Sequence, residues 1–486
     1  MRLKIISKLG LLSIVITVFL LFGELAAYFI SSSQLHNQSV ILMRYDEFIY
    51  GFIGMSPPPK FENPYISREI PLYKDATIGS PPTTIIIGNI LKLIPAPYPF
   101  NIIFIKSLFF CAVLYSLYLF YRNFFGLEES QIAFILTYMV PSLAFISGGV
   151  LYLLNILSNK HLYRIATLNT VTFSSLYYGL CVILGFTAIG SLVRTKKINL
   201  YQSILFMFSF FFHPVISAIY FLVYVFFIIY YRIKNKIYYL GIIILGLVPW
   251  IFIMGSIGKD YLILIKNNFS PLQVAYNVWL YLSFSFVYLL IIIYFWYKKV
   301  KIAPWKWIIF ILFFLLILSP ETKFALIRNT YLLFPFTVFT VIIVVSGYKI
   351  LPTNTKKALF SIILFLGAFN YLGAIYFNST QVIVRDNSEM SLLYTLKEYP
   401  PGAVLARDDL SYLVPAISHK KVLLGVYWEN SSNLEFYQQL ISGNASINYK
   451  YANQINYLLA PCNSTPNLGF QLNKTDNSNV TCIWSK

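Results

Sequence analysis

The chain has 486 residues, of which 58% are hydrophobic and 11% are charged, and its mean hydropathy is +0.68. This composition excludes an ordinary soluble globular domain. The formal net charge is +19, but many of the basic residues lie in short segments between apolar runs, where only Glu128 and Glu129 oppose them. That distribution is the positive-inside pattern of a polytopic membrane protein, so no nucleic-acid partner is expected.

Apolar runs long enough to cross about 30 Å of hydrocarbon predict eleven membrane-spanning helices. The basic segments place the N-terminus in the cytoplasm, and eleven spans then carry the C-terminus to the outside of the cell membrane. The first span is expected to be a retained helix rather than a cleaved signal peptide. The predicted spans are 9–31, 101–121, 131–150, 171–192, 199–212, 214–231, 237–256, 275–297, 305–319, 329–347 and 358–377.

Glycosylation sequons test this orientation, because Asn-x-Ser/Thr is modified only on the translocated side. Every sequon falls outside in the predicted topology. The sequon asparagines are Asn37, Asn268, Asn378, Asn430, Asn444, Asn463, Asn473 and Asn479.

The chain divides into a first transmembrane helix (1–31), a first outer loop (32–100), a transmembrane helical bundle (101–377) and a polar tail (378–486). Within the loop, residues 83–94 follow a proline pair and predict a short interfacial or re-entrant helix. The predicted fold class is an all-α polytopic membrane bundle with a small extracytoplasmic α/β or mixed domain at the C-terminus.

The tail has the sequence features of a small folded domain outside the cell. Its short apolar runs, such as 403–406 and 421–426, are bounded by Pro, Gly, Asp and Asn, which is typical of strands. Cys462 and Cys482 can close a disulfide in an oxidising exterior, whereas Cys111 and Cys181 lie within apolar helices.

The first outer loop carries the residues best suited to catalysis. Asp46 and Glu47 are adjacent in Arg44-Tyr45-Asp46-Glu47-Phe48, and Asp75 follows in the same loop. A carboxylate in a partly dehydrated cavity can have a raised pKa and act as a general base near neutral pH. The alternative is that these acids form a solvated loop face, which is the favoured interpretation for Glu62 and Glu69.

Several of these segments together resemble the GT-C superfamily of integral-membrane glycosyltransferases, in particular its protein O-mannosyltransferase and aminoarabinose-transferase branch. The matching features are the first helix, the Arg-Tyr-Asp-Glu opening of the outer loop, and a later Pro-Pro element before a short apolar helix. Looser matches are Phe120-Tyr-Arg122-Asn-Phe-Phe-Gly126 and Arg328-Asn-Thr-Tyr331-Leu-Leu-Phe-Pro335.

The resemblance implies transfer of a sugar from a polyprenyl (dolichyl) phosphate to a protein or glycolipid acceptor outside the membrane. Asp46 would be the base, with Glu47 and Asp75 as secondary candidates. Arg328 would stabilise the leaving lipid phosphate. The other substrate-binding candidates are Arg44, Tyr331, Lys323, Arg164 and His213.

Two departures from the family pattern are visible. The usual Lys-Pro-Pro or His-Pro-Pro is replaced by Gly79-Ser80-Pro81-Pro82, and no Trp-Trp-Asp motif of the kind oligosaccharyltransferases use to hold an acceptor sequon is present. The second departure argues against en-bloc transfer to asparagine.

Other roles for the chain stay open. The four histidines lack metal-ligand spacing, whereas a divalent ion held by Asp46, Glu47 and Asp75 is an open alternative. His213-Pro214 can serve as a turn without any ligand role. The whole chain can also be interpreted as a transporter, a lipid flippase or a noncatalytic scaffold, although acids concentrated in one outer loop are not typical of transporters.

Overall fold

The structure is a computed structural model of the whole chain, and it divides into two compact units. A helix unit groups residues 1–27, 106–250 and 261–381, and a second unit groups 28–105, 251–260 and 382–486. The residues described are 10–18, 38–41, 90, 93–94, 100–139, 150, 153–154, 176–233, 237–248, 271–298, 305–318, 329–348, 351–379, 383–406, 408–411, 413–423, 431–446, 452–475 and 481–486.

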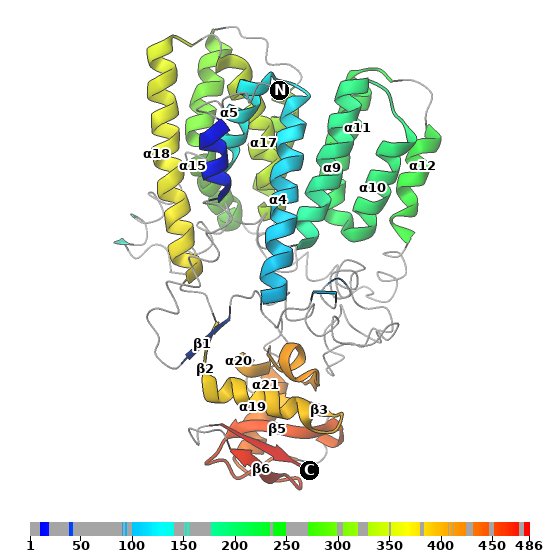
Figure 1. Cartoon of the computed structure of the whole chain (residues 1–486), viewed down its shortest axis with the longest axis vertical. Helices are drawn as coiled ribbons and strands as arrows, with labels where there is room; N and C mark the ends of the chain where they lie inside the picture. Colours follow the sequence, from blue (N-terminus) through cyan, green and yellow to red (C-terminus); the bar gives the residue numbers. More distant parts are fainter. Residues whose placement is uncertain are drawn as a thin grey trace, which may run out of the picture. The chain divides into compact units, whose positions relative to one another are not determined.

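Long apolar helices make up the described part of the helix unit (Figure 1). Helix also covers residues 10–18, inside the predicted first span. The bounds agree closely with several predicted spans. The helices are α4 (Phe100–Arg122), α5 (Leu127–Tyr138), α9 (Leu176–Thr195), α10 (Leu200–Phe212), α11 (Pro214–Tyr230), α12 (Ile237–Leu245), α15 (Pro271–Tyr297), α16 (Trp305–Leu318), α17 (Asn329–Tyr348) and α18 (Thr353–Ser379).

Local sequence explains where some of these helices begin. The Asn199 side chain accepts a hydrogen bond from the backbone N–H of Gln202 at 3.0 Å, which caps α10. Pro214 occupies the first position of α11, where its missing N–H costs nothing. Glu128 and Glu129 lie in the first turn of α5, where negative charge complements the helix dipole.

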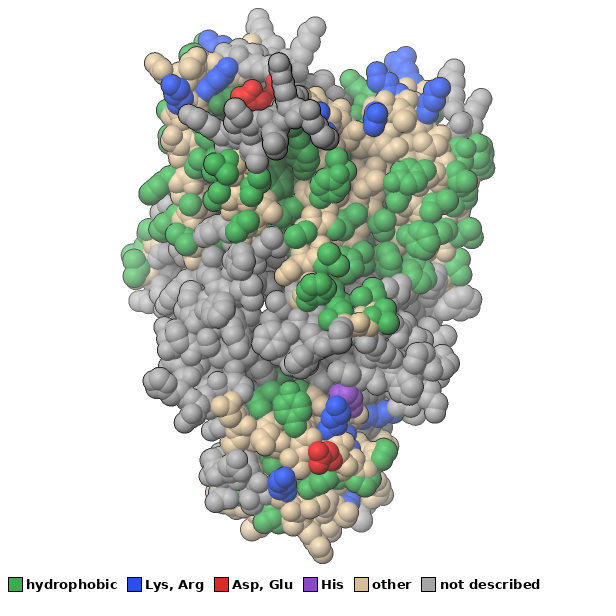
Figure 2. Space-filling view, viewed as in Figure 1, with side chains coloured by type: hydrophobic (Ala, Val, Ile, Leu, Met, Phe, Trp, Pro, Cys, Tyr) green, Lys and Arg blue, Asp and Glu red, His purple; other side chains and the backbone are tan. Residues whose placement is uncertain are grey.

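By length and hydropathy, two helices in the described residues can cross a membrane on their own, within Tyr178–Thr195 and Thr353–Gly373. Five further apolar helical segments among the described residues are shorter, at 10–17 residues. Eleven spans therefore remain a prediction. Lys and Arg side chains gather at one end of the helix unit, beyond a broad hydrophobic surface (Figure 2).

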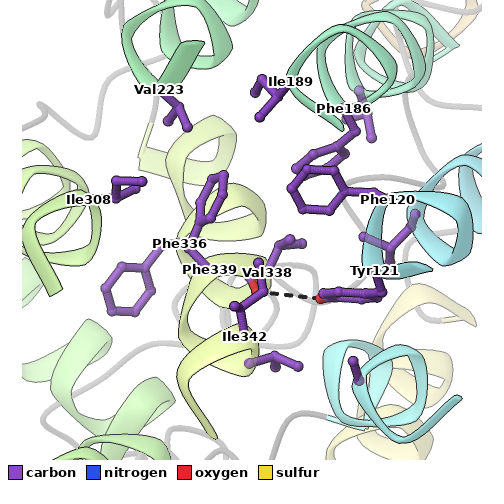
Figure 3. Close-up of a cluster of buried hydrophobic side chains, with 14 of the residues drawn as sticks. Phe120, Tyr121, Phe186, Ile189, Val223, Ile308, Phe336, Val338, Phe339 and Ile342 are labelled. Carbon is purple, nitrogen blue, oxygen red and sulfur yellow. Dashed lines mark hydrogen bonds between the residues drawn. The ribbon is translucent and has the colours of Figure 1, made fainter. Parts of the chain in front are cut away.

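The core of the helix unit is rich in aromatic rings (Figure 3). The Phe120 ring lies 4.6 Å from that of Phe186 and 6.1 Å from that of Phe339, which joins α4, α9 and α17. The Tyr121 hydroxyl donates a hydrogen bond to the carbonyl of Val338 at 3.4 Å. These contacts satisfy a buried polar group within an otherwise apolar core.

The second unit contains a five-stranded sheet in the order β4-β3-β5-β7-β6. Strand β3 pairs in parallel with β4 and β5, while β7 pairs antiparallel with β5 and β6. The elements are β3 (Ala403–Ala406), β4 (Lys421–Val422), β5 (Ile455–Pro461), β6 (Gln471–Thr475), β7 (Thr481–Ser485), α19 (Asn387–Glu398), α20 (Asp408–Ser411) and α21 (Ser431–Ile441). The chain is thus mostly helical with a small sheet near its C-terminus.

Two further contacts hold the second unit together. Cys462 and Cys482 form a disulfide between the end of β5 and β7. A core of apolar side chains that includes Leu405, Leu440 and Leu458 lies between the sheet and α21. A small domain of this kind gains stability from a cross-link because its apolar core is limited.

Candidate functional site

The predicted catalytic residues Asp46, Glu47 and Asp75 lie outside the described residues, as does Arg44. The nearest described element is strand β1 (Gln38–Ile41), which ends five residues before Asp46. It pairs antiparallel with β2 (Ile383–Asp386), so that Ile41 is opposite Ile383. The chain leading into the acidic motif is therefore tied to the segment that enters the C-terminal domain.

This pairing was not predicted from the sequence. The signal available was weak, because β1 is a run of only four residues, Gln-Ser-Val-Ile, and its partner lies more than 300 residues further along the chain. Strand pairs so distant in sequence have no local turn to specify their register. The pair nonetheless fixes the start of the motif-bearing segment within the second unit.

Of the predicted substrate-binding residues, Arg328, Lys323 and Arg164 also lie outside the described residues. Arg328 immediately precedes α17, and the backbone of Tyr331 lies in the first turn of that helix. One turn later, the ring of Phe334 lies 6.2 Å from that of Tyr138 and 6.5 Å from that of Tyr178. The start of α17 is thus held beside α5 and α9 by aromatic contacts.

His213 is the predicted site residue whose side chain is described most fully. It links α10 to α11, and its Nδ1 accepts a hydrogen bond from the backbone N–H of Ile216 at 3.4 Å. The imidazole therefore caps α11 in the way expected for the His-Pro turn. Its side chain is partly exposed.

A buried polar cluster lies directly beneath His213. The hydroxyl oxygens of Ser209 and Ser217 are 2.6 Å apart. Ser217 donates to the sulfur of Cys181 at 3.6 Å, and the thiol donates to the carbonyl of Ser209 at 3.7 Å. All three side chains are fully buried. The cluster joins α9, α10 and α11, and its polar groups satisfy one another rather than a ligand.

The helices that carry these residues run in a consistent direction. Helices α9, α11 and α17 begin at the end of the unit opposite to the basic end (Figures 1 and 2). His213 and the backbone of Tyr331 consequently share one end, away from Arg122 and Arg194. In the predicted topology this shared end is the outer one.

Nothing in the described residues identifies a metal site: they contain no group of three or more His, Cys, Asp or Glu residues placed to hold an ion. The three acids that the sequence suggests as ligands fall outside that part of the chain.

No protein-family model and no curated protein matches the chain. Among solved structures, it is similar to the crystal structure of the Archaeoglobus fulgidus oligosaccharyltransferase in the apo form. The sequence identity is 12% and the TM-score is 0.50, over 93% of this chain and 69% of that one. A structure of oligosaccharyltransferase AglB from the same organism, in complex with an inhibitory peptide and a dolichol-phosphate, gives 12% identity and a TM-score of 0.42, over 86% of this chain and 65% of that one.

At this identity the similarity concerns the fold. It does not distinguish the O-mannosyltransferase and aminoarabinose-transferase branch from other branches. What it shows is that the chain shares the overall fold of the archaeal oligosaccharyltransferase structure.

Proposed function

We propose that the chain is an integral-membrane glycosyltransferase with eleven spans, a cytoplasmic N-terminus and an outward-facing active site. It moves a sugar from a polyprenyl-phosphate donor to a protein or glycolipid acceptor. The observation that carries this proposal is the fold similarity to an oligosaccharyltransferase over 93% of the chain. The Arg44-Tyr45-Asp46-Glu47 motif in the first outer loop supplies the chemistry that such a fold requires.

In the proposed reaction, a hydroxyl or amide of the acceptor attacks the anomeric carbon of the sugar. The bond from that carbon to the lipid phosphate breaks, and Asp46 takes the proton that the acceptor loses. Arg328 lies at the start of α17 in sequence and stabilises the negative charge on the departing lipid phosphate. Glu47 and Asp75 orient the acceptor, while Arg44, Tyr331, Lys323, Arg164 and His213 are candidates for lining the donor site.

The test compares Asp46→Asn with Glu62→Gln, an acid of the same loop that has no assigned role. Membranes containing each variant at matched protein level receive labelled sugar on native polyprenyl-phosphate lipids. Loss of a positioned base lowers transfer by roughly 100-fold or more, so Asp46→Asn should be inactive and Glu62→Gln close to wild type. Equal transfer by both variants would contradict the role of Asp46, and no transfer by the unmodified chain would contradict the enzyme proposal.

A parallel series tests the leaving-group cation and the metal. Arg328→Gln should reduce transfer strongly, whereas Arg328→Lys should retain part of it because the positive charge remains. Addition of a chelator to the unmodified chain shows whether a divalent ion contributes. If Arg328→Gln has full activity, the phosphate is stabilised by another cation, and Lys323 and Arg164 are the next to be substituted.

A second acceptor class is favoured by one feature of the tail. Tyr427-Trp428-Glu429 is an aromatic-aromatic-acid sequence that differs from Trp-Trp-Asp by a conservative change at two positions. It lies between β4 and α21 in the chain, outside the described residues. Together with the oligosaccharyltransferase-like fold, it favours an asparagine acceptor within a sequon.

Peptide acceptors separate the two classes. A peptide containing Asn-x-Thr should be glycosylated if the asparagine assignment is correct, and its Gln-x-Thr counterpart should not. Trp428→Ala should raise the KM for that peptide. It should not abolish hydrolysis of the polyprenyl-phosphate donor or transfer of its sugar to other acceptors. Transfer to a Ser/Thr-rich peptide lacking asparagine, unaffected by Trp428→Ala, would instead assign the chain to the O-linked class.

A further inference from the structure

A groove with a volume of about 770 Å³ lies at the basic end of the helix unit. Its walls are the C-terminal turns of α4 and α9 and the first turn of α10. Phe120 and Phe186 contribute apolar surface, and their rings pack against each other in the core (Figure 3). The groove is therefore a feature of packed helices rather than of a loop.

Two guanidinium groups line this groove. Arg122 is the last residue of α4 and Arg194 lies in the last turn of α9, and both side chains are exposed. Within the part of the chain that the structure describes, neither guanidinium makes a hydrogen bond or an ion pair. The acids Glu128 and Glu129 of α5 do not line the groove. Two like charges in one groove favour an anionic ligand.

The remaining polar groups of the groove offer few other donors. The hydroxyls of Ser116 and Thr187 donate to carbonyls of their own helices at 2.9 Å and 2.6 Å. The hydroxyl oxygen of Ser191 accepts from the Gln202 side chain at 3.1 Å. The Asn123 amide and the Thr195 hydroxyl, which also line the groove, donate to backbone carbonyls of α4 and α9. The charged donors available to a ligand are thus the two guanidinium groups, and the exposed Tyr201 adds a hydroxyl at the start of α10. This set suits a phosphate, whose oxygens accept hydrogen bonds.

An exposed apolar stripe on α4 leads into the groove. Phe104, Leu108, Tyr115 and Leu119 are 58%, 61%, 63% and 45% exposed. Their spacing of four, seven and four residues places them on one helix face, and Arg122 follows three residues after Leu119. Along the helix the stripe extends about 22 Å at 1.5 Å per residue, more than the roughly 15 Å depth of one leaflet.

We propose that this groove binds an anionic membrane lipid, with its phosphate between Arg122 and Arg194 and an acyl chain along the stripe on α4. A basic pocket between helices at the cytoplasmic side is a recognised form of lipid headgroup site. The stripe distinguishes a lipid from free phosphate, because only a lipid benefits from the apolar surface. This site lies at the opposite end of the helix unit from His213 and is independent of the sugar-transfer reaction.

The experiment measures lipid retention by the intact chain in detergent, using native mass spectrometry with added phosphatidylglycerol or phosphatidylcholine. The groove variant carries Arg122→Gln and Arg194→Gln. The control carries Lys356→Gln and Lys357→Gln, which remove the same charge from the start of α18. We expect the unmodified chain and the control to prefer phosphatidylglycerol, and the groove variant to lose at least tenfold in affinity for it. Excess inorganic phosphate should not displace the lipid.

Equal losses in the groove variant and the control would show a general effect of surface charge and overturn the proposal. Displacement by inorganic phosphate would assign the groove to the free anion and also overturn it. If the groove variant does not fold, a photoreactive phosphatidylglycerol is added to the unmodified chain, and the labelled peptides show where the lipid binds. Labelling of peptides containing Tyr115–Arg122 or Ser191–Tyr201 supports the site, and labelling confined to other peptides overturns it.

Discussion

Buried threonines of the helix unit and buried polar side chains of the second unit form hydrogen bonds of different kinds. In the helix unit, the hydroxyls of Thr137, Thr337 and Thr340 donate to the carbonyl four residues earlier in the same helix, at 2.9, 2.9 and 2.7 Å. In the second unit, the Ser418 hydroxyl donates to the carbonyl of Leu393 and the Lys420 ammonium donates to that of Pro400. The first type of bond is local, and the second connects segments that are distant in sequence.

Solvent explains this difference. A helix in hydrocarbon has no water to bond with, so its polar groups bond within the helix or, like Tyr121, to a neighbouring helix. Helix association then depends on close packing. A small domain in water has a limited apolar core and depends on cross-links. Substitutions that remove packing should therefore destabilise the helix unit, while loss of long-range bonds should destabilise the second unit.

The largest effect is expected from removing the disulfide. Replacement of Cys462 and Cys482 by serine should lower the stability of the C-terminal domain by about 3 kcal/mol, because the bridge closes a loop of roughly 20 residues. Hydrogen exchange of the β5 and β7 amides measures the loss. Cys111→Ser, a free cysteine of the helix unit, is the control and should leave this exchange unchanged. Equal exchange in the double serine variant and in Cys111→Ser would show that the disulfide does not stabilise the second unit.

Close packing in the helix unit is tested at Gly185. A Cβ atom at this position would lie 2.7 Å from the buried ring of Tyr220, so α9 and α11 approach each other through the glycine. Gly185→Ala should lower the apparent melting temperature of the helix unit, with a cost of about 2 kcal/mol from overpacking. The control is Gly241→Ala in α12, where no atom lies within 4 Å of the added Cβ. An equal melting temperature for both variants would show that this contact is not tightly packed.

The extent to which the fold could be predicted from the sequence differs between the two units. The predicted span 101–121 corresponds to α4 at Phe100–Arg122, and 199–212 corresponds to α10 at Leu200–Phe212, because apolar length and caps are local signals. The strand order of the sheet and the β1–β2 pair depend on contacts between distant segments. Such contacts leave no periodic pattern in one sequence.

The candidate site residues show the same division between local sequence signals and contacts between distant segments. The turn at His213-Pro214 follows from local chemistry, and the structure shows the imidazole capping α11. The groove between Arg122 and Arg194 was not predicted, because each arginine taken alone is explained by the positive-inside pattern. Only the packing of α4 against α9 brings the two guanidinium groups into one groove. The roles of Asp46 and Arg328 stay predictions for the transfer assays.

A smaller effect of pH is expected at a histidine of the second unit. Burial and the nearby charges of Lys397 and Lys420 lower the pKa of His419 to about 4. The unfolded chain, with an ordinary histidine pKa of about 6.5, then binds the proton more readily, so stability is complete above about pH 6.5 and falls as the pH drops toward 4. Because the ring is partly exposed, solvent screening reduces the loss to the order of 1 kcal/mol.

Substitution of His419 by asparagine tests this pH dependence. The residue has a φ of 55°, a left-handed conformation that asparagine tolerates. His419→Asn should flatten the fall in stability between pH 6.5 and 4, as followed by exchange of the β3 amides at each pH. An unchanged pH profile in this variant would assign the dependence to another group.

The smallest and sharpest test compares two buried hydroxyls directly. Ser418 donates to the carbonyl of Leu393, 25 residues away, at 2.9 Å, while Thr340 donates to Phe336 within α17 at 2.7 Å. Ser418→Ala should cost about 1 kcal/mol, because it removes a hydrogen bond that joins two segments 25 residues apart. Thr340→Val should change stability by less than about 0.5 kcal/mol, because a bond to the preceding turn adds little to a helix whose carbonyl is already bonded. If both substitutions cost the same, local and long-range bonds are equivalent in this chain, and the difference between its two units must arise from packing alone.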